Sequence, residues 1–145
     1  MFVEETIIGE VKRLLAGRVN DLLQEVGFQI PLIDFDGGTG TVCPGLRLAL
    51  GERTEKDRII KVDVYALTIT LNVPDLWFHG NLGERNCYAY AALVEQALAE
   101  DVTLGGTVDQ VVLTGKKYTP PKIPHCGDGW EVIITLRITL DGMTL

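Results

Sequence analysis

The sequence predicts an α/β domain of the α+β type, in which a mixed, mainly antiparallel β-sheet packs against two α-helices. Three observations lead to this class. Apolar residues recur every three or four positions near the N-terminus, an alanine-rich segment follows residue 82, and the remaining segments alternate with a period of two. The chain has 145 residues, 46% of them hydrophobic, so we expect one domain with a single core over residues 1–145.

The first element is an amphipathic helix over residues 3–26, which Gly27 ends. Gly9 and Gly17 each cost about 1 kcal/mol relative to alanine inside a helix, so we expect close approach of a neighbouring backbone to offset them. A coiled coil is the competing interpretation, but the pattern ends after about three heptads. The predicted apolar face consists of Val3, Ile7, Val11, Leu14, Leu15, Val19, Leu22 and Val26.

A short strand is expected next over residues 29–35, and Pro31 confines it to an edge or a start position. Residues 36–40 then form a glycine-rich turn. A phosphate-binding loop is the alternative, but its glycines must open a helix, and here they lead towards a strand. Asp34 and Asp36 offer two carboxylates to a divalent cation, although two acids without further oxygen ligands are more typical of a solvated turn.

Residues 45–50 and 58–71 predict a β-hairpin with a polar tip. The apolar positions of the second strand change parity, from the side of Val64 to the side of Leu67. This change predicts a bulge or bend near Ala66–Leu67, or a strand whose second half is covered on both sides.

A second helix is predicted over residues 83–100, where small side chains allow close packing on a sheet. The chain then turns at a joint over residues 101–106, in which Asp101 and Thr103 favour turn geometry and Gly105 and Gly106 permit positive φ. The expected core face of this helix consists of Cys87, Tyr90, Ala91, Val94 and Leu98.

Two further strands complete the predicted order α-β-β-β-α-β-β. The first covers residues 107–118 and alternates loosely, and the second covers residues 130–140. A proline-rich loop over residues 119–129 separates them.

Charge and cysteine content exclude several classes of function. The formal net charge is −7 and the isoelectric point is near 4.7, which disfavours specific nucleic-acid binding because no basic cluster is present. No apolar run is long enough to span a membrane, and acids stand where a signal peptide needs bases. We therefore expect a soluble protein of the cytoplasm with no membrane partner. Its cysteines, Cys43, Cys87 and Cys126, are expected to be reduced thiols.

The sequence offers few candidates for catalysis or metal binding. His79, His125 and Cys126 lack the paired spacing of zinc ligands. Cys126 beside His125 is the only candidate for a cysteine nucleophile, but adjacent residues often point apart. We expect no catalytic residue, cofactor or metal. A small ligand-binding domain or enzyme is the alternative, and its mark would be a pocket around His125, Cys126 and Asp128.

Large aromatic residues stand in segments that are expected to be exposed to water. Trp77 and Phe78 precede the second helix, Trp130 flanks the proline-rich loop, and Tyr118 ends the strand before it. Trp77 and Phe78 either cover the end of the core or contact a neighbouring subunit. We expect Trp77, Phe78, Tyr118 and Trp130 at or near heterologous subunit interfaces, as in a ring.

The order of elements and the joint resemble the tail terminator or tail completion proteins of long-tailed bacteriophages and prophages. The layout covers nearly the whole chain, and residues 61–69 also look like the central strand of this family. The residues that carry the resemblance are Leu98, Asp101, Thr103-Leu104-Gly105-Gly106, Val108 and Val132-Ile133-Ile134-Thr135-Leu136-Arg137-Ile138.

The resemblance implies a structural role and no enzymatic activity. Family members form six-membered rings that cap the tail tube, stop its polymerisation and offer a surface for head joining. The implied partners are further copies of the chain, the tail tube protein and the head-tail connector protein, in the bacterial cytoplasm during assembly and then in the virion tail. In this family Gly105 and Gly106 would serve only as a joint of the fold.

Three alternatives to a tail terminator stay open. A head-tail joining protein or another minor tail protein belongs to the same assembly. A generic oligomerisation module and the small cytoplasmic ligand-binding domain or enzyme belong to other classes.

Overall fold

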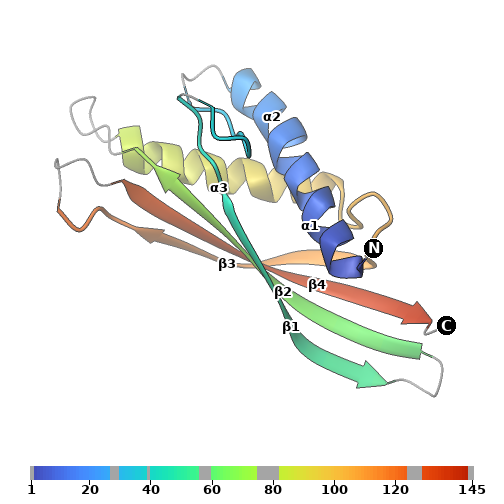
Figure 1. Cartoon of the computed structure of the whole chain (residues 1–145). Helices are drawn as coiled ribbons and strands as arrows, with labels where there is room; N and C mark the ends of the chain where they lie inside the picture. The colour runs from blue at the N-terminus through green and yellow to red at the C-terminus, as the bar shows by residue number, and fades with distance from the viewer. Residues whose placement is uncertain are drawn as a thin grey trace.

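The computed structural model describes residues 2–26, 30–38, 40–55, 60–74, 82–123 and 129–143, which form a layer of helices on one face of a β-sheet (Figure 1). This arrangement confirms the predicted α+β class. The elements in chain order are α1 (Val3–Leu14), the π-helical turn η1 (Leu15–Val19), α2 (Asn20–Glu25), β1 (Gly45–Glu55), β2 (Ile60–Val73), α3 (Leu82–Glu100), β3 (Gln110–Thr119) and β4 (Trp130–Met143).

The four strands lie in the order β1-β2-β4-β3, and every neighbouring pair is antiparallel. The central strands β2 and β4 pair without interruption, from Ile60 opposite Met143 to Val73 opposite Trp130. The register shifts once in each outer strand, between Leu50 and Glu52 in β1 and between Leu113 and Gly115 in β3.

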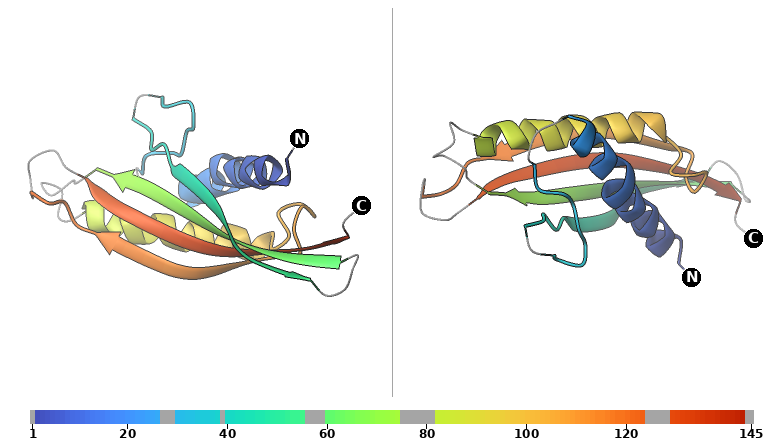
Figure 2. Two further views of the ribbon diagram at one scale, coloured as in Figure 1. Left: turned by 60° about the horizontal axis from the view of Figure 1, so that its bottom comes forward. Right: turned by 90° about the horizontal axis from the view of Figure 1, so that it is seen from above.

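The hydrophobic core lies between the sheet and the helices. Helix α3 contacts β2, β3 and β4, while α1 contacts β1 (Figure 2). Every residue of the predicted core face of α3 is buried. Burial of one Leu, Ile or Val side chain stabilises the fold by about 1.5–3 kcal/mol, so this side of the sheet dominates its stability. The sheet contributes Tyr65, Leu67, Ile69, Leu71, Val73, Val111, Val132, Ile134, Leu136 and Ile138.

The first helix follows its predicted range but contains the π-helical turn η1. A π-turn accommodates one extra residue and rotates the following side chains. Asn20 begins α2 directly after it, and its side-chain amide donates to the carbonyls of Ala16 at 2.9 Å and Ile33 at 2.8 Å. Its Oδ1 accepts the Ile33 N–H at 2.8 Å. This one side chain therefore fixes the segment after the helix.

Two expectations for this helix need correction. Val3 and Val26 are 38% and 40% exposed, because the apolar face extends beyond the sheet at both helix ends. The close backbone approach expected at Gly9 and Gly17 is wrong. No described atom lies within 4 Å of a Cβ placed on either glycine, because both lie on the exposed side of the helix.

The prediction of a strand over residues 29–35 is also wrong for residues 30–35, which the structure describes. Residues 30–35 make one isolated parallel bridge, Ile33 opposite Val42. The backbone N–H and C=O of Ile33 bond to the amide of Asn20, so they are not available to a neighbouring strand. The predicted turn that follows is present, with the Asp34 carboxylate accepting the N–H groups of Asp36 at 2.9 Å and Gly38 at 3.2 Å.

The bulge predicted near Ala66–Leu67 is not in β2. This strand keeps its register against β4 throughout, and the shift in the hairpin lies in β1, between Leu50 and Glu52. The second half of β2 is not covered on both sides either, because no described helix or strand lies over the face that carries Thr68 (Figure 2). The apparent change of parity arises because Val64 and Ala66 belong to that face.

The joint after α3 has the predicted positive φ angles, +68° at Gly105 and +85° at Gly106. Leu104 is a non-glycine residue with φ +49° and is fully buried. The Asp101 Oδ1 accepts the Gly105 N–H at 2.9 Å, which holds the turn closed. A Cβ on Gly105 would lie 3.5 Å from the Glu10 carboxylate, so the joint lies against α1.

Candidate interaction surface

One face of the sheet has no helix or strand of the described residues over it (Figure 2). Strand residues point to alternate faces, so this face carries the residues between the buried ones. We call it the open sheet face. It consists of Arg47, Ala49, Val62, Val64, Ala66, Thr68, Thr70, Asn72, Gln110, Val112, Lys117, Thr119, Glu131, Ile133, Thr135, Arg137, Thr139 and Asp141.

The register aligns these residues in rows across the strands. One row contains Ala49, Ala66, Arg137 and Val112. The two alanines have short side chains, so the surface beside the exposed Arg137 is flat. Val112, on the other side of Arg137, is 42% exposed. The centre of the open sheet face is therefore a flat surface of small and β-branched side chains around one guanidinium group.

The cations of this face have no acidic partner in the described part of the chain. No ion pair there includes Arg47, Lys117 or Arg137, and all three are exposed. Such groups are free to bind a carboxylate from another molecule.

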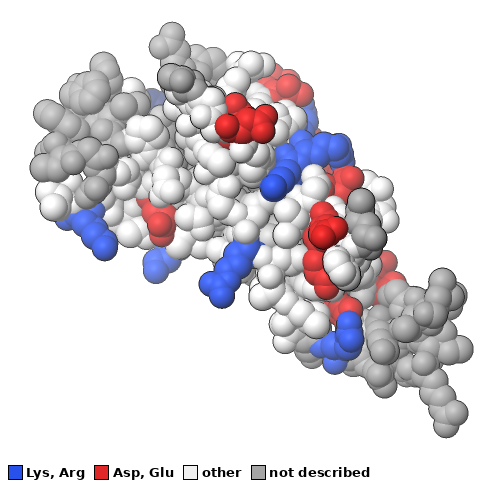
Figure 3. All heavy atoms as spheres, viewed as in Figure 1, with Lys and Arg blue, Asp and Glu red and all other residues white. Residues whose placement is uncertain are grey.

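The helical layer carries most of the negative charge of the chain, whereas the strands are nearly neutral. The helices and residues 101–109 contain ten acidic and four basic residues, whereas the four strands contain five acidic and six basic residues. In Figure 3 acidic and basic side chains lie side by side in the region of the first helix, and further Lys and Arg side chains project from the lower margin of the molecule. The charge of −7 therefore lies almost entirely in the helical layer and the joint.

Basic residues of the helical layer are largely paired within it. Arg13 bonds to Glu10 at 2.6 Å, and Arg18 bonds to Glu100 at 2.7 Å. The hydrogen bond from Arg18 lowers the pKa of the Glu100 carboxyl below its usual value. Since acids outnumber bases, carboxylates remain in excess. We call the exposed carboxylates of α1 and α2 the acidic helix surface, which consists of Glu4, Glu5, Asp21 and Glu25. Glu25 lies 3.8 Å from Arg18, and Lys12 and Arg13 are exposed on α1.

Two of the four predicted interface aromatics lie in the described residues. Tyr118 in β3 is half-buried and packs edge-to-face on Tyr88 of α3, with ring centroids 5.0 Å apart. Trp130 begins β4 and packs against the core. Both pair with buried residues of the helical side, so the open sheet face does not include them. Trp77 and Phe78 lie outside the described residues, and the interface role of all four stays a prediction.

The described residues bring together no catalytic or metal-binding cluster. They contain no group of three or more His, Cys, Asp or Glu side chains placed to hold a metal ion. Cys43 is exposed, while burial raises the pKa of the Cys87 thiol to about 12, far from that of a nucleophile. His79, His125, Cys126 and Asp128 lie outside the described residues.

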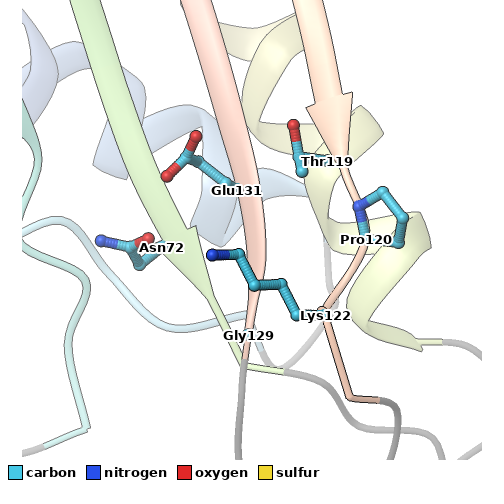
Figure 4. A pocket seen from close by; sticks show the side chains of 6 residues that line it. All are labelled: Asn72, Thr119, Pro120, Lys122, Gly129 and Glu131. Carbon is cyan, nitrogen blue, oxygen red and sulfur yellow. The ribbon is translucent and has the colours of Figure 1, made fainter.

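A hollow of about 550 Å³ lies at one end of the open sheet face. Asn72, Thr119 and Glu131 are register neighbours on β2, β3 and β4, and Lys122 reaches across from the segment after β3 (Figure 4). Pro120 and Gly129 complete its lining. This hollow extends the open sheet face and contains no paired nucleophile and base.

The open sheet face was missed by sequence reasoning. Its signal was the threonine alternation in β2 and β4, at Thr68, Thr70 and Thr135, which is typical of a strand side without apolar cover. None of the described helices is both long and apolar enough to cross a membrane. No protein-family model matches the chain, and the search of curated proteins finds no match either. The proposal for function therefore depends on this surface and on the resemblance stated above.

Proposed function

We propose that this protein is a structural subunit of a bacteriophage or prophage tail, which assembles into a six-membered ring and caps the tail tube as a tail terminator. In this role it stops tube polymerisation and presents the surface for the head-tail connector. The proposal makes the chain a protein-binding subunit and no enzyme.

One observation carries the proposal: the domain has two different surfaces on opposite sides, an open sheet face of small, β-branched and mixed charged side chains and a helical layer that carries most of the negative charge. A closed ring needs heterologous contacts, in which one patch meets a different patch on the next copy. The open sheet face and the acidic helix surface supply such a pair. Gly105 and Gly106, which have positive φ angles, are among the residues on which the resemblance to tail terminators depends.

The test combines mass and capping. Light scattering after gel filtration is expected to give six times the chain mass of 15.9 kDa, either alone or after tail tubes are added. Tubes polymerised from the tail tube protein of the same phage or prophage should stop growing when the protein is added, as measured by tube length in negative-stain images. Tubes that keep growing, with the protein absent from their ends, would overturn the proposal.

A head-tail joining protein is the second candidate, and the same two surfaces favour it. Such a protein would bind the connector or the finished tail without limiting tube length. The length measurement therefore separates the two roles.

A further inference from the structure

We infer that two copies of this chain form a two-fold dimer through their open sheet faces, in which Arg137 of each copy binds Glu131 of the other. The occupant of the open sheet face is therefore a second copy of the chain. The inference goes beyond the proposed function and does not rest on it. Its basis is the position that the strand register gives to charged and small side chains on this face.

Two opposite charges of β4 lack a partner within the chain. Arg137 and Glu131 both lie on the open sheet face, and six residues of extended strand separate them by roughly 20 Å. No ion pair of the described residues includes either side chain. Asp141, which also lies on this face, already has an interaction within the chain. Arg137 and Glu131 are too far apart to bind each other in one copy, but they are available to each other in two copies.

The surfaces around these two charges have complementary shapes. Arg137 is exposed beside the short side chain of Ala66 on β2, so its guanidinium group projects from flat surroundings. Glu131 lies in the hollow of about 550 Å³, which Asn72 and Thr119 also line (Figure 4). Carboxylate, amide and hydroxyl oxygens accept hydrogen bonds, and a guanidinium group presents five N–H donors. The projecting group of one copy therefore matches the hollow of another in shape and in chemistry.

Lys122 lines the same hollow without neutralising Glu131. No ion pair of the described residues joins the two side chains, and Lys122 is exposed. The lysine stem is flexible, so its ammonium group can stay in water when a guanidinium group enters. Arginine also binds a carboxylate in a bidentate geometry that lysine lacks. The Glu131 carboxylate is thus open to an arginine from outside the chain.

A two-fold axis brings both pairs of charges together at once. The axis runs across the strands, between the row of Ile133 and the row of Thr135. It places Ile133 of one copy over Thr135 of the other, and Arg137 over Glu131. In a two-fold contact each pair occurs twice, because residue i of one copy meets residue j of the other and the reverse also holds. The arrangement therefore contains two Arg137–Glu131 contacts.

The other two cations of the face meet glycine in the same arrangement. Lys117 and Gly115 lie in the two rows beside the axis, so Lys117 of one copy lies over Gly115 of the other. Arg47 lies over Gly45 for the same reason. Sheets that pack face to face keep their strands within about 30° of each other, so these relations hold near the axis. No cation of this face is then placed directly over a cation of the partner.

The area of the contact predicts a weak and reversible dimer. The rows from Glu131 to Arg137 give a flat area of about 400 Å² on each copy, taking about 4.8 Å between strands and about 3.3 Å per residue. A stable interface buries about 800 Å² on each partner, and smaller interfaces are typical of transient association. We therefore expect a dimer whose population depends on concentration.

Charge reversal tests the inference without any phage component. Light scattering and sedimentation should show the wild-type mass of 15.9 kDa double reversibly as the concentration rises. Arg137→Glu places carboxylates together at both symmetric contacts, so we expect the dimer Kd to rise at least about tenfold, and Glu131→Arg should have the same effect. Lys117→Glu makes the same charge change opposite a glycine of the partner, and it should alter the Kd by less than about threefold.

The decisive variant carries Glu131→Arg and Arg137→Glu in one chain. The two-fold axis again places opposite charges together, so the Kd should return to within about threefold of the wild type. A double variant that associates as weakly as the single variants overturns the inference, and so does an equal loss with Lys117→Glu. A wild-type chain that stays at 15.9 kDa at all concentrations overturns it as well. Circular dichroism checks that each variant is folded.

The outcomes keep this inference separate from the proposed function. One face holds one partner at a time, so the dimer has to open before this face can take part in a ring. A chain that dimerises as expected but does not stop tube growth refutes the tail function and keeps the dimer. A chain that caps tubes but never doubles in mass keeps the tail function and overturns the dimer.

Discussion

The two faces of the sheet are built from the same strands, yet they differ in almost every property. On β4, Leu136 is fully buried under the helices, while its neighbour Arg137 is exposed on the open sheet face. One face holds the apolar core, and the other holds threonine, alanine and charged side chains, among which Arg47, Lys117 and Arg137 form no ion pair within the described residues. The difference shows that a two-layer domain separates the residues that stabilise the chain from the residues that are free to bind a partner.

The sharpest test of this comparison changes adjacent residues of β4. Leu136→Ala removes a fully buried side chain and leaves a cavity, so we expect the free energy of unfolding to fall by about 2–5 kcal/mol. Arg137→Ala should change it by less than about 0.5 kcal/mol. Urea unfolding at protein concentrations where the chain is monomeric measures both. Equal losses in the free energy of unfolding would show that the open sheet face is covered within one chain. The two faces of the sheet would then not differ in their contribution to stability.

The next test compares two glycines, Gly129 just before β4 and Gly115 in β3. A Cβ on Gly129 would lie 2.6 Å from the carbonyl oxygen of Val73, so Gly129→Ala forces the start of β4 away from β2. We expect a loss of about 1–3 kcal/mol in the free energy of unfolding. Gly115 in β3 has no described atom within 4 Å of its Cβ position, and Gly115→Ala is the control that should cost nothing. A neutral Gly129→Ala in urea unfolding would contradict the close approach.

Asn20 tests whether the helical layer depends on a single polar side chain. Asn20→Ala removes the partners of the Ile33 N–H and C=O, so we expect a loss of about 1–3 kcal/mol, measured by thermal and urea unfolding. Asn72→Ala, at the exposed end of β2, should lie within about 0.5 kcal/mol of the wild type. If both substitutions cost the same, the segment around Ile33 is held by other contacts.

The smallest expected effect is the pH dependence of the surface pair Arg18–Glu100. Arg18 lowers the pKa of Glu100 in the folded state, so the pair stabilises the fold above the unfolded pKa, and this contribution is lost as pH falls through the lowered pKa. Glu100→Gln should therefore be less stable than the wild type at pH 7, and the difference should shrink below about pH 4. High salt should reduce it at neutral pH. A difference that persists at pH 3 would indicate a packing effect.

The regular elements were largely predictable from the sequence because each has a clean period. The predicted core face of α3, with Cys87 and Tyr90 at its start, is buried in full. The hairpin of β1 and β2 and the final strand also lie where alternation predicted them. The period of apolar residues that predicts each of these elements can be seen within the element's own stretch of sequence.

The failures share a different cause, which is contact between residues that are distant in sequence. Asn20 satisfies the backbone of Ile33, thirteen residues away, and this contact removes the strand expected there. The candidate surface was harder to predict still. Arg47 and Arg137 share a face only because β2 lies between their strands, and no local pattern contains that pairing.

The register shifts of β1 and β3 have a consequence for how copies of this chain avoid one another. Both shifts lie in edge strands, and the central strands have none. A bulge interrupts the row of free backbone groups that a second sheet would extend, and Lys116 and Lys117 follow the bulge on β3. Fibril-like growth from edge to edge is thus opposed at both sides of the sheet, and the route left to association is through the faces of the domain.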